Sequence, residues 1–187
     1  GTLLLIDSLA NRGDFGPAIA LLAQADAGNP GLLARRAELQ LEAGRESDAA
    51  RDLRELAATA DGDLRVAEVY QRREDFAASI PLLEGALARD SDSLEVGFRL
   101  ATALERVGRI DEAVKRFREL VARAPAFAPA LNYLGYLWIE RSENLDRAVP
   151  MVREAVRLDP DNGSYVDSLG WGYFKLGRYS EAVSYLE

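Results

Sequence analysis

Apolar residues recur along this chain at helical spacing, in short segments that are separated by turn residues. In one kind of segment a large apolar residue follows another after four positions, as in Leu134-Gly135-x-x-Trp138. In the second kind a small residue precedes a large apolar one by four positions, as in Ala113-x-x-x-Phe117. Spacings of three to four residues are typical of amphipathic helices. The pattern therefore predicts pairs of short helices and an all-α fold.

The small residues of the second segments recur at a nearly constant interval. The six anchors are spaced by 31, 30, 34, 35 and 34 residues and are Ala18, Ala49, Ser79, Ala113, Ala148 and Ala182. Four of them follow a glycine by five positions, and Pro125 and Pro160 stand twelve positions after their anchors. Glycine supplies the left-handed conformation that ends a helix, and proline cannot continue one. Each unit is therefore predicted to be a helix A, a tight turn, a helix B and a second turn.

These features resemble the tetratricopeptide repeat family over essentially the whole chain. The closest matches to its signature are Leu169-Gly170-x-x-Tyr173 followed by Ala182, and Leu134-Gly135 followed by Ala148, Ala155 and Pro160. The resemblance implies an all-α, right-handed superhelical solenoid of about six helix-turn-helix units, the first and last incomplete, with the A helices lining a concave groove. The units from Ala130 onward resemble those of bacterial multi-repeat proteins.

We expect one array over residues 1–187, cut from a longer protein, because the chain starts without Met and stops inside a helical pattern. Its units are 1–29, 30–59, 60–93, 94–127, 128–162 and 163–187. The short interval before Ser79 predicts a shortened helix near residues 60–63, and the long one before Ala148 predicts an extra residue in the loop 141–144. Pro81 and Pro150 fall inside helix B, which predicts either a proline on the outward face or a later helix start.

Composition and charge remove several function classes. The 23 basic residues are outnumbered by 31 acidic ones, giving a net charge of −8, which argues against nucleic acid and anionic membrane surfaces. The absence of Cys and His excludes disulfides, zinc sites and His-dependent triads from this segment. Residues 172–179 have the glycine spacing of a phosphate loop but lack its Lys-Ser/Thr. We expect no metal, no cofactor, no catalysis and no membrane insertion, in the bacterial cytoplasm or on the periplasmic side of the envelope.

Aromatic residues concentrate toward the C-terminus and suggest a binding surface. Trp138 and Tyr173 are expected to wedge between helices A and B, while Tyr136 and Trp171 lie on the next helical face. The resemblance implies that this face lines the groove, although both side chains could instead pack between neighbouring A helices. The expected groove residues are Phe98, Thr102, Asn132, Tyr136, Asp167, Trp171 and Lys175. An acidic Asp167 would repel a terminal carboxylate, so capture of a chaperone tail is disfavoured.

The function that follows is protein–protein interaction, with a groove that receives a segment of a partner protein. One alternative is a substrate-recognition segment of a larger enzyme. Another is end-to-end self-association into homo-oligomers through ends that lack a capping helix. For the last alternative, the apolar residues expected to be partly uncovered are Leu3, Leu4, Ile6, Val183 and Leu186.

Overall fold

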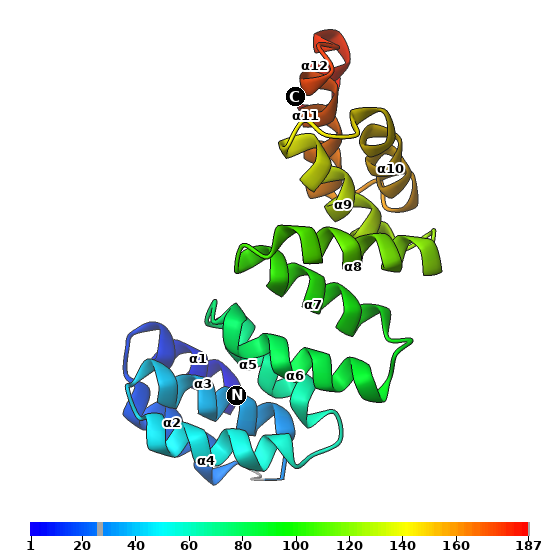
Figure 1. Cartoon of the computed structure of the whole chain (residues 1–187). Helices are drawn as coiled ribbons and strands as arrows, with labels where there is room; N and C mark the ends of the chain where they lie inside the picture. The colour runs from blue at the N-terminus through cyan, green and yellow to red at the C-terminus, as the bar shows by residue number, and fades with distance from the viewer. Residues whose placement is uncertain (26–27, 187) are drawn as a thin grey trace. The chain divides into compact units, whose positions relative to one another are not determined.

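The computed structural model describes residues 1–25 and 28–186, which form twelve α-helices and no strand. A first compact unit, ending at Asp92, contains α1 (Thr2–Asn11), α2 (Phe15–Gln24), α3 (Pro30–Glu42), α4 (Glu46–Ala57), α5 (Gly62–Arg72) and α6 (Phe76–Arg89). A second unit, beginning at Ser93, contains α7 (Leu94–Arg106), α8 (Ile110–Arg123), α9 (Ala128–Glu140), α10 (Leu145–Leu158), α11 (Gly163–Lys175) and α12 (Tyr179–Leu186). Each odd-numbered helix packs against the even-numbered helix that follows it (Figure 1). The all-α helical repeat is confirmed.

A left-handed residue ends the first helix of every hairpin. Four of these residues are glycines with φ between 70° and 82°: Gly13, Gly44, Gly108 and Gly177. Glu74 takes this place between α5 and α6, with φ of 60°. The connection from α9 to α10 spans four residues, 141–144, whereas the other five span three, and Ser142 and Asn144 are both left-handed. The predicted turns and the extra residue are thereby confirmed.

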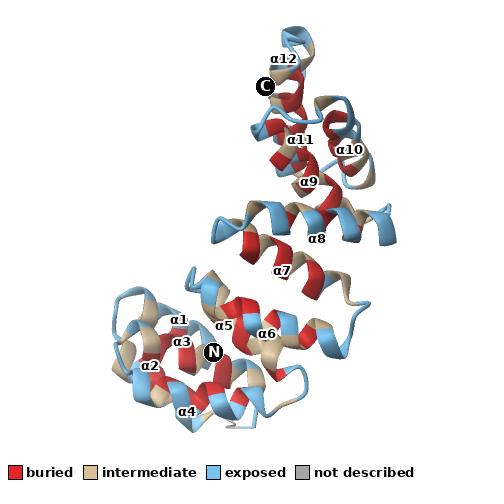
Figure 2. Ribbon diagram, viewed as in Figure 1, coloured by how far each residue is buried: buried red, intermediate tan, exposed pale blue. Residues whose placement is uncertain are grey.

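The six small anchor residues explain why the repeat has its period. All of them lie on even-numbered helices, and none is more than 3% exposed: Ala18, Ala49, Ser79, Ala113, Ala148 and Ala182. The only polar anchor, Ser79, satisfies its hydroxyl by donating to the backbone oxygen of Phe76 at 2.8 Å. Buried residues, red in Figure 2, gather where the two helices of a hairpin meet. A small side chain at this point lets the second helix approach the first closely.

The two interior prolines lie on outward-facing positions of complete helices. Helices α6 and α10 already begin at Phe76 and Leu145, and Pro81 and Pro150 are exposed within them. The alternative of a later helix start is therefore wrong. Each proline removes one backbone donor, and at an exposed position water can satisfy the carbonyl that this donor would have reached.

Helix α5 is short because the chain turns sharply before it. It has 11 residues, whereas α3, α7, α9 and α11 have 13 each, as the reduced interval predicted. Asp61 adopts a left-handed conformation, with φ of 57°. A Cβ on Gly62 would lie only 2.4 Å from the backbone oxygen of Ala57, so no side chain fits there.

The apolar residues near the two ends are uncovered, with one exception. Leu3, Leu4, Val183 and Leu186 are 61%, 74%, 50% and 52% exposed. The expectation was wrong for Ile6, which is 1% exposed. Its side chain faces α2 and α3 and belongs to a buried cluster with residues such as Leu22 and Leu39. None of the described helices combines the length and the apolar character that crossing a bilayer requires.

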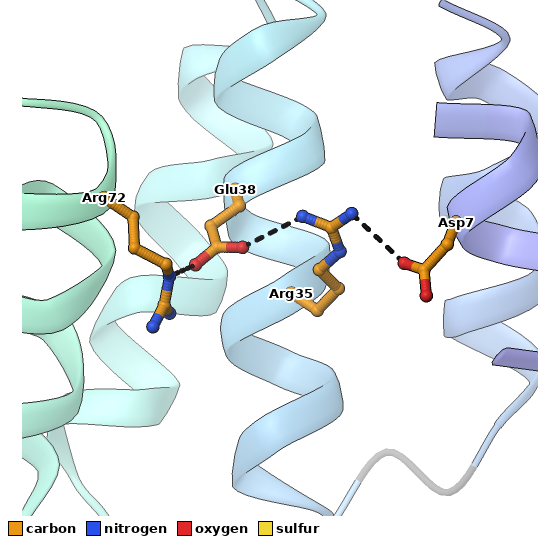
Figure 3. Close-up of polar contacts among 4 residues, drawn as sticks. All are labelled: Asp7, Arg35, Glu38 and Arg72. Atoms are coloured by element: carbon orange, nitrogen blue, oxygen red, sulfur yellow. Dashed lines mark hydrogen bonds and ion pairs between the residues drawn. The ribbon is translucent and has the colours of Figure 1, made fainter. Parts of the chain in front are cut away.

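A chain of ion pairs connects three odd-numbered helices of the first unit (Figure 3). Glu38 of α3 is 5% exposed, and one of its carboxylate oxygens accepts from Arg35 at 3.3 Å. The other accepts from Arg72 of α5. Arg35 also reaches Asp7 of α1 at 3.3 Å. The buried carboxylate is thus neutralised by two guanidinium groups, and the three helices share one charge network.

Candidate protein-binding site

Helices α9 and α11 bring the predicted aromatic residues together because glycine lets the helices approach closely. A Cβ on Gly172 of α11 would lie 2.9 Å from Ile139 of α9 and 2.9 Å from Val149 of α10. Such contacts are shorter than real Cβ contacts, so a larger residue here would force its neighbours to shift. The close approach places Tyr136 and Trp171 on the wall of a common cavity.

This cavity has a volume of about 500 Å³, within the range of ligand pockets. It is lined by Tyr136 and Glu140 of α9, by Ser164, Asp167, Ser168 and Trp171 of α11, and by Leu186 of α12. We call it the A-face cavity, since most of its wall belongs to the first helices of two hairpins. Three of the seven expected groove residues, Tyr136, Asp167 and Trp171, line it.

Trp171 lines the cavity and also packs against the core, so its role in a binding groove stays a prediction. Its indole N–H donates to the carboxylate of Glu140, which lines the same cavity. Its ring stacks on Phe174 at 5.1 Å between centroids and also packs against the buried cluster that contains Tyr173. The expected Lys175 does not line the cavity, but its ammonium group lies 5.1 Å from the indole centroid. These contacts hold the indole in a fixed orientation.

The charge of the A-face cavity is negative. Glu140 and Asp167 contribute two carboxylates, and none of the described residues in the wall is basic. Asp167 is exposed and has no ion pair among the described residues. Burial, followed by the nearby carboxylates of Glu140 and Glu105, raises the pKa of the Tyr136 hydroxyl further above the neutral range. Together these groups suit a cationic side chain with an apolar stem.

The other expected groove residues lie outside this cavity. Phe98 is half-buried in an aromatic cluster, with ring centroids 5.7 Å from Phe117 and 5.8 Å from Tyr133. The hydroxyl of Thr102 donates to the backbone oxygen of Phe98 at 3.0 Å. The Oδ1 atom of Asn132 is buried and has no hydrogen-bond partner among the described residues. A groove role for these three residues stays a prediction.

Of the two expected wedge residues, one is fully in the core. Tyr173 is 5% exposed, and its hydroxyl accepts from Arg153 at 2.8 Å, which confirms the expectation. Trp138 packs against the same buried cluster but is only half-buried. The rest of its side chain lines a different cavity.

Four residues of the wall were not among the expected groove residues: Glu140, Ser164, Ser168 and Leu186. The positions 164, 167, 168 and 171 follow the spacing i, i+3, i+4, i+7, so the two serines could have been found by extending the face of Trp171. Leu186 could not, because its place in the wall depends on how α12 packs against α11.

Tyr133 of α9 lies beside the site and lowers the stability of the second unit at alkaline pH. Burial, and then its hydrogen bond to Glu105 at 2.9 Å, raise the pKa of this hydroxyl well above 10. The unfolded chain loses the proton near pH 10 while the folded chain keeps it. The free energy of unfolding therefore falls as the pH rises through 10, by at most about 1.4 kcal/mol per pH unit.

We therefore expect Tyr133→Phe to cost about 1 kcal/mol at pH 8, through the lost hydrogen bond, and to flatten the decline above pH 10. Urea unfolding of both proteins between pH 8 and pH 11 measures the two slopes. Equal slopes would show that the hydroxyl of Tyr133 ionises alike in the folded and unfolded chains.

Comparisons with known proteins place this arrangement of hairpins in a family. The family model for the tetratricopeptide repeat matches residues 98–163 and 140–187. The TPR repeat-containing protein PA4667 of Pseudomonas aeruginosa is 27% identical over an alignment of 181 residues that covers 92% of this chain. The chain spans 30% of the length of that relative.

Solved structures show the same fold at low sequence identity. MamA from Desulfovibrio magneticus RS-1 is 20% identical, with a TM-score of 0.65 over 87% of this chain and 92% of that one. YrrB, described as a TPR protein with an unusual peptide-binding site, is 17% identical, with a TM-score of 0.57 over 88% of each chain. The fold is thus that of a helical repeat protein. More specifically, this chain contains tetratricopeptide repeats, which the family model matches over residues 98–187.

Proposed function

We propose that this protein is a non-catalytic interaction scaffold that binds an extended segment of a partner protein in the A-face cavity. The observation that carries the proposal is that Tyr136, Asp167 and Trp171 line one cavity. Tyrosine and tryptophan provide large apolar contact area at low entropic cost and retain a polar group, which makes them frequent binding hot spots.

The charge of the cavity selects the kind of segment. Two carboxylates and two aromatic rings attract a Lys or Arg side chain, whose stem covers the rings while its head reaches Asp167. We therefore propose a segment in which basic and apolar residues alternate, since alternate side chains of an extended peptide point to the same side.

The test uses the fluorescence of Trp171 in a Trp138→Phe background, because the chain has only two tryptophans. The probe is a ten-residue peptide of alternating arginine and leucine, compared with one of alternating glutamate and leucine. We expect only the basic peptide to shift the emission of Trp171 saturably. Tyr136→Ala should weaken its binding about thirty-fold, as for a hot-spot aromatic worth about 2 kcal/mol.

A matched pair of charge reversals separates the site from the general acidity of the chain. Asp167→Lys, in the cavity, should weaken binding of the basic peptide about tenfold. Glu84→Lys changes the net charge equally at an exposed position of α6 in the other unit, and should change binding less than twofold. Equal effects of the two reversals, or equal affinity for the two peptides, would rule out the A-face cavity as the binding site.

A further inference from the structure

A second cavity, of about 530 Å³, lies on the side of the even-numbered helices in the second unit. We call it the B-face cavity. Its apolar wall includes Leu134 and Trp138 of α9 and Met151 of α10, and α8 contributes the opposite side. Helices α8 and α10 both pack against α9, so the cavity has two helical walls and a floor that contains an aromatic ring.

The rim of the B-face cavity has the opposite charge to the chain as a whole. The protein as a whole has 31 acidic and 23 basic residues. This rim has three basic residues, Lys115, Arg118 and Arg147, and one acidic residue, Glu119. Glu119 already pairs with Arg116 at 3.5 Å. The three cationic side chains are exposed and form no ion pair among the described residues. Their charge is therefore available to a ligand.

We propose that the B-face cavity binds a second partner segment, which is acidic and carries a large apolar side chain. The apolar side chain enters between Met151 and Trp138, and carboxylates on either side of it reach the cations at the rim. Positive charge stands on both walls, with Arg118 on α8 and Arg147 on α10. This distribution matches a peptide with several carboxylates better than an amphiphile with one charged head.

This inference goes beyond the A-face cavity, and neither proposal depends on the other. The A-face cavity is lined by α9, α11 and α12 and is acidic, whereas the B-face cavity is lined by α8, α9 and α10 and has a basic rim. Because the two cavities share no lining residue, one molecule can hold a basic and an acidic segment at the same time.

The two tryptophans allow each cavity to be observed separately. In a Trp171→Phe variant, Trp138 becomes the only tryptophan and reports on the B-face cavity. The probe is the ten-residue peptide of alternating glutamate and leucine. We expect it to shift the emission of Trp138 saturably and to bind at least tenfold more weakly when NaCl is raised from 50 mM to 500 mM, since salt screens exposed charges.

Arg147→Glu should weaken binding of the acidic peptide at least tenfold. Residue 147 lies in the first turn of α10, where a carboxylate is favourable to the helix, so this variant should stay folded. The matched control is Arg54→Glu, at an exposed position of α4 in the other unit, which should change binding less than twofold.

Three outcomes would overturn the proposal. The first is an emission of Trp138 that does not respond to the acidic peptide, and the second is an equal loss of binding in Arg147→Glu and Arg54→Glu. The third is saturable binding of dodecanoate without binding of the peptide, which would identify a lipid-type ligand. Because the A-face test reads Trp171 with the basic peptide, failure of either proposal leaves the other measurable.

Discussion

Arg36→Met is expected to lower the free energy of unfolding of the first unit by about 3–5 kcal/mol. Arg36 of α3 donates two hydrogen bonds to Asp52 of α4, from Nε at 2.6 Å and from Nη2 at 2.9 Å. The side chains are 16% and 5% exposed. The hydrogen bond to Asp52 raises the pKa of Arg36, so the guanidinium group stays charged. Methionine can occupy the space of the arginine stem, but it leaves a carboxylate buried without its counter-charge.

The matched control is Arg51→Met in the same unit. Arg51 pairs with Asp48, but these side chains are 68% and 42% exposed, so the loss should stay below about 1 kcal/mol. Urea denaturation followed by circular dichroism measures both variants. Adding Asp52→Leu to Arg36→Met should restore most of the stability, because replacing both members of a buried pair with apolar residues is often neutral. Equal losses in the two arginine variants would show that burial does not determine how much an ion pair contributes to the free energy of unfolding.

The fold was predictable because its determinants are local and recur. Gly108 with a left-handed φ and the buried small residue Ala113 five positions later describe one hairpin, and the same features appear in three others. The left-handed turn favours glycine, and the close packing of the helices favours a small residue. Each requirement is therefore visible in the sequence as a residue type. The prediction for Ile6 failed because its burial is not set by local pattern. Helices α2 and α3 cover its side chain, although it lies near the start of the sequence.

Helical spacing predicts which residues of the candidate site share one face of a helix, and it predicts nothing further about the site. Tyr136, Asp167 and Trp171 share that face and do line one cavity. The contacts that orient them join residues one repeat apart, such as Glu140 and Trp171, which are 31 positions apart. Glu38 and Arg72 in the first unit are 34 positions apart. Helical spacing does not reveal such pairs, because they depend on how neighbouring helices are rotated and on side-chain conformations.

Phe117→Ala is expected to destabilise the second unit by about 3–5 kcal/mol. Phe117 of α8 is fully buried, stacks on Tyr133 of α9 at 4.8 Å and meets the edge of Phe98 of α7 at 5.7 Å. Alanine would forfeit the burial of the ring and leave a cavity, which neighbours in a closely packed interior fill only partly.

The loss of Phe117 should affect two interfaces, because its contacts hold a hairpin together and also join it to the next. In repeat proteins both kinds of contact contribute to stability. Phe117→Leu keeps most of the volume and should cost about 1 kcal/mol. Urea unfolding, with the tryptophan emission recorded alongside circular dichroism, compares the two variants with the parent protein. A similar small loss for alanine and leucine would mean that the neighbouring rings close the space, and that the aromatic cluster is not what joins these hairpins.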